Sequence, residues 1–531
     1  MTDTALVCDF AIAGGGSAGC LLAARLIESG YRVCLVEAGE KRGGIDSRLP
    51  ALGTFAMEDR AQTWRYQASP NARIEGRQIL IRQGRRLGGT GALNGMCYVR
   101  GRADDFDGWN VPGWRWADVL PYFERTEDYR GRHAGQRGSS GPIRISDNDF
   151  RIPVSEAFVR SAIASGIAAN AAPNTGDNEG TGYYERFIFR GWRTSDTYRN
   201  ALRRYRSSGR LILLSGHAVE RIAFDGRRAT GLEITRLADR TRRIVRVTRE
   251  VILSAGAFGS PAILQRSGIG PEPVLAQAGV TPIVNAPDVG ANLQDHFSIR
   301  LIVESPGART INDFARWPRV VLQAARWALG RPSILSVSPA LAYAFFRALP
   351  DAEKIDATIF FSPGRLGSAG PALSHQGGIT CGIYPLRPES RGTVRIISSS
   401  ASDAPDIQPN YLHAERDLAI TIAALKRARR IFSLPPLSGY AGREVAPGPD
   451  VATDDEMADF IRSTGVSSHH PCGSVALGRA LDSDLSVIGV SGVRVADASV
   501  LPVMPSGNIL APVLMVAERA AAFLHHPGGT G

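Results

Sequence analysis

The sequence CDFAIAGGGSAGCLLAARLIESGYRVCLVE, residues 8–37, contains a strand, a glycine turn, a helix and a second strand in immediate succession. Residues 8–13 alternate β-branched or aromatic residues with small ones, which is typical of a short buried strand. Leucine and alanine then recur with helical spacing to about residue 29, and Gly30 ends the helix. Residues 32–37 form the second strand. This order predicts a parallel βαβ unit at the start of an α/β fold.

The glycine turn has the spacing of a dinucleotide-binding loop. Gly14 permits the tight turn, Gly16 lets a pyrophosphate approach the backbone, and Gly19 lets the helix pack on the strand. The second strand ends at Glu37, where a carboxylate accepts hydrogen bonds from ribose hydroxyls and disfavours a 2′-phosphate. An ordinary turn is the alternative, but the complete unit favours a dinucleotide. It does not distinguish NAD from FAD.

The composition indicates a globular α/β protein rather than a nucleic-acid-binding one. The chain has 531 residues, 44% of them hydrophobic and 58 of them glycine, which allows a large core with many loops. Its net charge is +11, but the positive residues are nearly all arginines spread along the chain. A phosphate-binding stripe would be clustered, so we expect no nucleic-acid partner. An acidic membrane surface stays an alternative.

The cysteines and apolar runs predict a soluble, cytoplasmic protein. The six cysteines show neither disulfide-like nor metal-ligand spacing, so we expect reduced thiols and no metal site. We expect no signal peptide before the first strand, and the apolar run 334–346 is too short and too polar to cross a bilayer.

A second glycine-rich stretch, GRRLGGTGALNGMCYVRG, occupies residues 84–101. It offers backbone N–H groups and Asn94 to a group lying close to the main chain. A long surface loop is the alternative. Because the glycines bracket apolar Leu87, Leu93 and Met96, we favour a buried loop packed against a flat ring. An NAD-dependent dehydrogenase would leave this stretch unexplained.

These motifs resemble the glucose-methanol-choline (GMC) family of FAD oxidoreductases. The resemblance is carried by residues 14–19 with Glu37, by RLGGTGALNGM at 86–96 and by WNVPGWRWADVLPYF at 109–123. It implies an α/β fold in which a Rossmann-like FAD-binding domain is joined to a substrate domain built on an antiparallel sheet. Some members attach FAD covalently through a histidine that would fall at Leu93. Leucine cannot form that bond, so the resemblance implies non-covalent FAD.

The same resemblance divides the chain. We expect a discontinuous FAD-binding domain and a substrate-binding domain, the first made of residues 1–148, 203–296 and 456–531, the second of residues 149–202 and 297–455. The family's words Ser-Pro-Ala-Ile-Leu and Asn-Leu-Gln-Asp-His recur at 260–264 and 292–296, and we predict a structural role for His296. The residues expected to contact FAD are Gly14, Gly16, Ser17, Ala18, Gly19, Glu37, Ala38, Trp64, Arg86, Gly88, Gly89, Asn94, Gly95, Met96, Cys97, Val219, Ala255, Asp497, Ala498 and Asn508.

The expected chemistry lies near the C-terminus. Hydride transfer from an alcohol requires a neutral base beside the ring to take the hydroxyl proton, and the ordinary pKa of histidine suits that role. The sequence Ser467-Ser-His-His-Pro-Cys-Gly-Ser474 matches the family's His-Pro word at His470, while a solvated turn or an incidental metal site is the alternative. Asn508 aligns with the second member of the family's catalytic pair, where an amide can hold the substrate oxygen.

We therefore predict FAD-dependent oxidation of a primary alcohol, apolar or aromatic, to the aldehyde, with hydride transfer to flavin N5 and His470 as general base. The electrons then pass to oxygen or to another acceptor. The alternative is a hydroxynitrile lyase-like enzyme that keeps FAD without net redox chemistry. The pocket candidates are Met96, Tyr98, Phe360, Phe361, Tyr384 and His469, and they show no aromatic cage that would favour choline.

One basic segment is not explained by these motifs. Residues 315–331 place two tryptophans and a valine among arginines with helical spacing. A helix packed over the active-site entrance is the favoured interpretation. The alternatives are a membrane-surface helix and a contact between copies of the chain in a homodimer.

Overall fold

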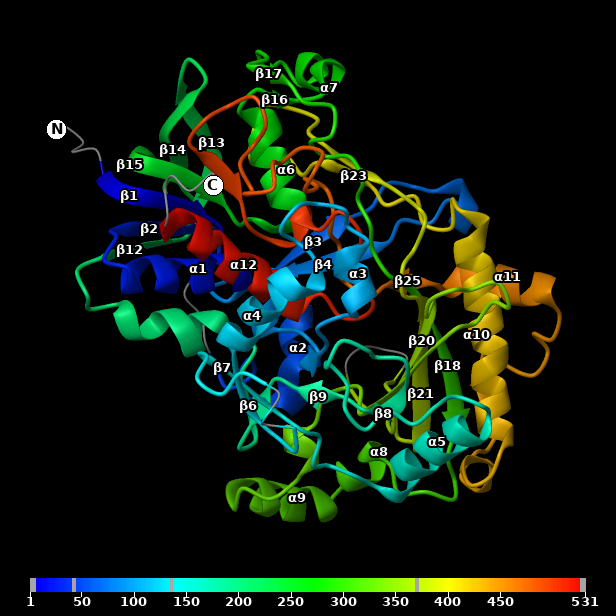
Figure 1. The fold of residues 1–531 in the computed structure, drawn as a ribbon. Helices are drawn as coiled ribbons and strands as arrows, with labels where there is room; N and C mark the ends of the chain where they lie inside the picture. The colour runs from blue at the N-terminus through cyan, green and yellow to red at the C-terminus, as the bar shows by residue number, and fades with distance from the viewer. Residues whose placement is uncertain (1–5, 41–43, 134, 136, 368–371, 526–531) are drawn as a thin grey trace.

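The computed structural model describes residues 6–40, 44–133, 135, 137–367 and 372–525. Two sheets organise these residues. Figure 1 shows the first sheet beside the N-terminus and the second on the opposite side of the molecule, with the β3–β4 hairpin and helix α3 between them. The fold is a mixed α/β architecture that includes antiparallel sheets, as predicted.

The first sheet has the order β12-β2-β1-β15-β14-β13, and β26 also pairs with β15. Its parallel part contains the predicted βαβ unit, because β1 pairs with both β2 and β15 in parallel. Strands β14 and β13 extend the sheet as an antiparallel hairpin. The strands are β1 (Leu6–Ala13), β2 (Val33–Glu37), β12 (Leu211–Ser215), β13 (His217–Asp225), β14 (Arg228–Arg236), β15 (Arg242–Leu253) and β26 (Val493–Val495).

Helix α1 (Ser17–Glu28) packs against the C-terminal helix α12 (Leu510–His525), which in turn contacts α4 (Trp116–Thr126). Most of α1 is buried because small residues alternate with leucine all round the helix, so both the sheet and α12 can approach it closely. Figure 1 shows α12 lying alongside α1. The last helix of the chain therefore covers the first βαβ unit.

The second sheet has the order β24-β18-β21-β20-β19-β8, with β25 also on β18, and all of these pairs are antiparallel. Helices α5 (Pro153–Ala164), α10 (Glu415–Ser433) and α11 (Asp454–Thr464) pack together, and α5 and α10 contact its strands. The strands are β8 (Gly180–Tyr183), β18 (Phe297–Glu304), β19 (Ala342–Phe346), β20 (Ala357–Ser362), β21 (Gly378–Pro385), β24 (Glu444–Ala446) and β25 (Val466–Ser467).

Smaller elements lie between the two sheets. Strands β3 (Thr63–Gln67) and β4 (Leu80–Gly84) form a hairpin, and β5 (Cys97–Tyr98), β6 (Glu127–Arg130), β7 (Ile143–Ser146) and β9 (Glu185–Arg186) form a further sheet. The glycine-rich stretch 84–101 thus begins at the end of β4 and continues into β5. Helix α3 (Ala103–Asp107) follows β5, whereas α6 (Gly256–Arg266) packs on β13 of the first sheet and α7 (Glu272–Gln277) lies at the top of the molecule in Figure 1.

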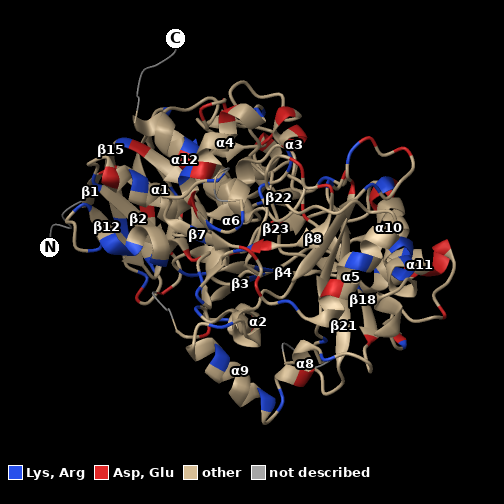
Figure 2. Ribbon diagram, turned by 60° about the horizontal axis from the view of Figure 1, so that its bottom comes forward, with Lys and Arg blue, Asp and Glu red and all other residues tan. Residues whose placement is uncertain are grey.

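The basic segment forms helix α9 (Arg319–Ala328) rather than one helix over its whole length. Its inner side packs through Trp327, which contacts Trp192 and donates a hydrogen bond to the Gly191 carbonyl. Trp317 and Leu322 are exposed, and Figure 2 shows α9 at the edge of the molecule with basic residues and no acidic ones. No residue of the segment 315–331 lines either of the cavities described below, and its position over the active-site entrance stays a prediction. Within the described residues, no helix is both long and apolar enough to cross a bilayer.

Candidate active site

The two glycine-rich stretches pack directly against each other. A Cβ added to Gly89 would lie 2.7 Å from the Gly16 Cα, and one added to Gly91 would lie 2.5 Å from the Ser17 hydroxyl. The Gly88 N–H donates to the Gly15 carbonyl at 2.8 Å. Gly89 and Gly91 are therefore required by this close approach, as predicted for a buried loop.

The turn before α1 is shaped for a ligand as well as for packing. Gly14 has φ +106°, and its added Cβ would lie 2.4 Å from the Ser254 carbonyl oxygen, so the fold itself requires that glycine. Gly16 is different, because the nearest protein atom to its added Cβ is 3.8 Å away. No side chain caps the N-terminus of α1, which leaves its first N–H groups open. An anionic pyrophosphate fits this space and this dipole.

Glu37 closes the other side of the turn. Its carboxylate accepts hydrogen bonds from the Gly15 N–H at 2.9 Å and from the Gly39 N–H at 2.8 Å. Burial raises the pKa of this carboxyl, and the two N–H groups oppose that shift. Each oxygen still has a lone pair available, so the carboxylate can accept hydroxyl hydrogen bonds from a ribose.

A cavity of about 630 Å³ runs from this turn to the C-terminal histidines. Its lining joins the end of β2 and the strand β13 to the segment around His470, with Trp64 from β3 between them. The predicted FAD contacts that line it are Gly14, Gly16, Ser17, Ala18, Glu37, Ala38, Trp64, Gly89, Asn94, Gly95, Met96, Cys97, Val219, Ala255, Asp497, Ala498 and Asn508. Segments that lie far apart in the sequence thus meet in one elongated cavity.

Three predicted FAD contacts do not line the cavity. Gly19 lies beneath the turn, where an added Cβ would be 2.0 Å from the Gly14 carbonyl oxygen. Arg86 is buried and donates to the Gln62 side chain at 2.5 Å. Gly88 lies behind the turn and holds it through its bond to Gly15. All three support the wall of the cavity from behind.

His470 and Asn508 meet at the far end of the cavity. The Asn508 amide nitrogen lies 3.1 Å from His470 Nε2, and His470 Nδ1 lies 3.0 Å from His296 Nδ1. The other ring nitrogen of His296 lies 2.9 Å from the Leu386 carbonyl oxygen. The two imidazoles and the amide therefore form one hydrogen-bonded chain that ends on the backbone.

The end of this chain determines the tautomers. A carbonyl oxygen can only accept, so His296 must be protonated on Nε2, and its Nδ1 must accept from His470 Nδ1–H. His470 is then left with a lone pair on Nε2, the atom beside Asn508. Burial lowers the pKa of His296 to about 4, and burial with the neighbouring histidines lowers the pKa of His470 well below its ordinary value. His470 is held as a neutral base whose Nε2 lone pair accepts from the Asn508 amide N–H.

The backbone around His470 is held by a buried carboxylate. Asp295 accepts from the His470 N–H at 2.9 Å and from the Tyr411 hydroxyl at 2.6 Å, and Ser467 also donates to it. Burial raises the pKa of Asp295 to about 6. Strand β25, which precedes His470, pairs with β18 of the second sheet. The second sheet therefore helps to position His470.

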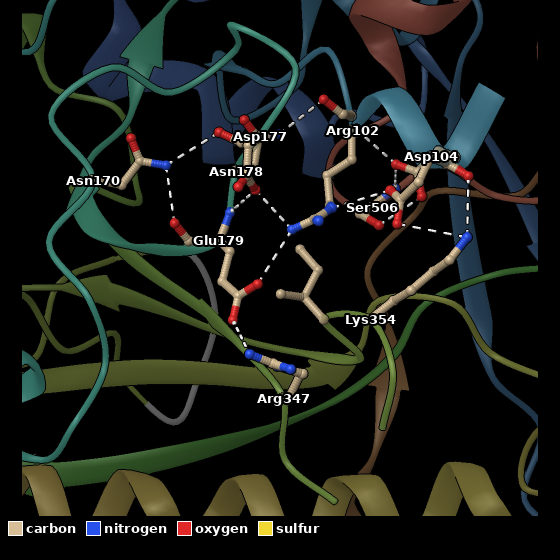
Figure 3. A network of polar contacts seen from close by, with 12 residues as sticks. Arg102, Asp104, Asn170, Asp177, Asn178, Glu179, Arg347, Lys354 and Ser506 are labelled. Atoms are coloured by element: carbon tan, nitrogen blue, oxygen red, sulfur yellow. Dashed lines mark hydrogen bonds and ion pairs between the residues drawn. The ribbon is translucent and has the colours of Figure 1, made fainter. Parts of the chain in front are cut away.

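Asn508 is positioned from the opposite direction by α3. The Ser506 N–H and hydroxyl both donate to Asp105 at 2.8 Å, and Arg387 donates to the same carboxylate at 2.7 Å. Figure 3 shows Ser506 beside a polar network in which Arg102 pairs with Asp104 and Asp177. The loop that carries Asn508 is thus connected through ion pairs to the edge of the second sheet.

A second cavity of about 570 Å³ lies on the other side of His470 and Asn508. Of the predicted pocket residues, Phe360, Tyr384 and His469 line this cavity, and Met96 lines the first one. Two predictions are not supported by the linings. Phe361 follows Phe360 on β20, so it points to the opposite face and stacks on Phe158 in the core. Tyr98 is buried, and its hydroxyl donates to Glu127.

The fold and the site define an oxidoreductase, because the cavity that begins at the dinucleotide-binding turn ends at His470, a neutral histidine that also lines the second cavity. Models of the GMC oxidoreductase family match residues 8–298 and 388–517. The chain belongs to this family, and it is an FAD-dependent oxidoreductase that acts on CH–OH groups.

Several relatives share nearly the whole length of the chain. An oxygen-dependent choline dehydrogenase of Vibrio vulnificus is 35% identical over 98% of this chain and 94% of its own, and one of Brucella melitensis is 35% identical over 97% and 95%. Among solved structures, a pyridoxine 4-oxidase from Mesorbium loti superposes with a TM-score of 0.88 at 31% identity, covering 98% of this chain and all of that one. A formate oxidase, with a TM-score of 0.90 at 22% identity over 98% of both chains, shows the same fold.

The contact of His296 with His470 was missed from the sequence, where His296 was predicted to be structural. His296 follows Asp295 directly, and Asp295 accepts a hydrogen bond from the His470 N–H.

We expect His296→Leu to lower the rate of flavin reduction about 10- to 100-fold, because His470 Nδ1–H loses its acceptor and the tautomer is no longer held. Stopped-flow measurement of that rate, with FAD content as control, tests this. An unchanged rate would contradict the positioning role.

Proposed function

We propose that this enzyme oxidises a primary alcohol to the aldehyde, with His470 as the general base and Asn508 as the residue that holds the alcohol oxygen. The alcohol is apolar or aromatic around its hydroxyl carbon, since Tyr184, Phe360 and Tyr384 line the second cavity. The observation that carries the proposal is the position of His470 and Asn508, which line both cavities at once.

The residues would act in a defined order. The alcohol enters the second cavity, and its hydroxyl replaces the Asn508 N–H on the His470 Nε2 lone pair. The freed Asn508 N–H then donates to the alcohol oxygen. His470 takes the hydroxyl proton while the Asn508 amide keeps the oxygen in place as negative charge develops on it. When bound, FAD supplies the acceptor for the hydride that leaves the alcohol carbon. His296 then stabilises the protonated His470 through the shared Nδ1 contact.

The first cavity fits FAD held without a covalent bond. Its lining supplies the turn and the carboxylate for the pyrophosphate and ribose, and residues 89–97 for a flat ring. Leu93 lines this ring end and is 2% exposed, and it carries no nucleophile. We expect acid precipitation of the purified protein to release all of its flavin into the supernatant. Flavin retained in the precipitate would contradict non-covalent binding.

The reaction class is tested by mixing the purified yellow protein with a panel of primary alcohols without oxygen. Bleaching of the flavin absorbance together with aldehyde formation supports alcohol oxidation. Persistent yellow colour with aldehyde release from a cyanohydrin would instead support the lyase alternative. Repeating the reaction with oxygen, and with an artificial electron acceptor in its place, identifies which acceptor restores the yellow form faster.

A further inference from the structure

Arg300 places a positive charge beside the catalytic pair. It lies on β18, where alternation sends Ile299 and Leu301 into the core and Arg300 to the opposite face. Arg300 lines both cavities, as do His470 and Asn508. Arg300 is flanked on β18 by apolar and small residues from Phe297 to Val303, and a buried charge is costly unless it is paired.

The neighbouring strands make room for this side chain. Arg300, Gly382 and Phe360 lie side by side on β18, β21 and β20. The Arg300 guanidinium lies 5.0 Å from the centre of the Phe360 ring, above Gly382. A Cβ added to Gly382 would be 2.0 Å from the Phe360 ring and 2.6 Å from Arg300 Nη1. The glycine therefore lets the guanidinium and the ring meet over the middle strand.

No protein carboxylate balances the Arg300 charge within the part of the chain that the structure describes. Its hydrogen bond goes to the Ser298 hydroxyl at 3.1 Å, and burial lowers its pKa. The second cavity also has Arg77 and Arg82 in its lining, and no aspartate or glutamate. Those two arginines have other partners, because Arg77 donates to backbone carbonyls and Arg82 pairs with Glu58.

We propose that the alcohol substrate carries an anionic group, a carboxylate or a phosphate, which pairs with Arg300 while the hydroxyl faces His470. This inference rests on the proposed function and names the substrate class of the same site. A guanidinium can bind either anion with two parallel hydrogen bonds, and the stacked Phe360 ring holds it in a fixed plane. The same charge repels a quaternary ammonium, so choline does not fit this cavity.

Matched substrates test the proposal on the purified holoenzyme. We use 4-(hydroxymethyl)benzoate, its neutral amide 4-(hydroxymethyl)benzamide, and 4-(hydroxymethyl)phenyl phosphate, and measure flavin reduction without oxygen. We expect kcat/KM for the better of the two anions to exceed that for the amide by about 10-fold or more. The carboxylate and phosphate arms show which anion is preferred. Equal kcat/KM for the amide and both anions would overturn the proposal.

Variants assign the preference to Arg300. In Arg300→Met we expect the ratio of anion to amide to fall to about one, mainly through a higher KM for the anion. Arg300→Lys, which keeps the charge, should restore part of the ratio. The matched control is Arg443→Met, which removes an exposed arginine paired with Glu304 outside both cavities and should leave the ratio as in the wild type. A preference that survives in Arg300→Met contradicts the assignment.

Binding separates this inference from the proposed function. Calorimetric titration of the holoenzyme with benzoate and phenyl phosphate, against benzamide, needs no turnover. If no alcohol reduces the flavin but either anion binds about 10-fold more weakly to Arg300→Met than to the wild type, the reaction is wrong and the anion site stands. If alcohols reduce the flavin and neither anion binds more tightly than benzamide, the reaction stands and the anion site is wrong.

Discussion

Replacing His470 by alanine should lower the rate of flavin reduction by the alcohol about 10²- to 10⁴-fold while FAD stays bound. The reason is the hydrogen-bonded chain that ends at the Leu386 carbonyl, which leaves His470 Nε2 unprotonated and therefore able to take a proton. In the proposed arrangement the other group on the alcohol oxygen is the Asn508 amide, which cannot take its proton. Stopped-flow flavin reduction without oxygen measures the loss.

The control for this variant is His413→Ala, because His413 is exposed and lines neither cavity. The pH dependence of the wild type gives an independent check. Since the pKa of His470 is lowered below 6.5, the base form persists as the pH falls from about 8 to 6.5. We expect kcat/KM to stay level over that range and to fall only at lower pH. A normal rate in His470→Ala would remove the base assignment.

Gly16→Val should abolish FAD binding and leave the rest of the fold intact. The backbone of Gly16 has φ −72°, which valine can adopt, and no protein atom lies within 3.4 Å of the position of its Cβ. The branched side chain would instead fill the space that we assign to the pyrophosphate, at the open N-terminus of α1. We expect FAD affinity to fall about 100-fold or more, which corresponds to roughly 3 kcal/mol.

The measurement is equilibrium binding of FAD to the apoprotein, with circular dichroism and thermal unfolding of the apo form to show that it is folded. Gly439→Ala is the matched control, because a Cβ there meets no atom within 4 Å and Gly439 lines neither cavity. Wild-type FAD affinity in Gly16→Val would show that the cofactor lies elsewhere. Because a Cβ on Gly16 has space around it, we expect the apo form of Gly16→Val to stay folded.

Local patterns predicted much of the fold. The βαβ unit depends on neighbouring residues and turns, so its predicted position was close to that observed. Strand β15 extends back to Arg242, well before the apolar residues 251–253, because the antiparallel partner β14 pairs with its polar half. Helix α6 begins at Gly256, four residues before the word Ser-Pro-Ala-Ile-Leu, and Asp497 accepts a hydrogen bond from the Gly256 N–H.

The parts of the site that were missed depend on contacts between distant segments. His296 meets His470 across 174 residues, and nothing in the word Asn-Leu-Gln-Asp-His shows which way that ring points. Arg300 became informative only when β18 placed it opposite the core, beside Phe360. Phe360 and Phe361 are adjacent aromatic residues, and only the pairing of β20 decided which of them faces the cavity.

Because Ser506 is attached to Asp105, Asn508 and the base His470 are held by different parts of the molecule. The His470 imidazole is positioned by β18 through β25, whereas the Asn508 amide is positioned by α3 and Arg387. The spacing between these two groups therefore depends on where α3 lies relative to β18 and β25. We therefore expect substitutions in the ion-pair network of Figure 3 to change the catalytic rate, although the residues labelled there line neither cavity.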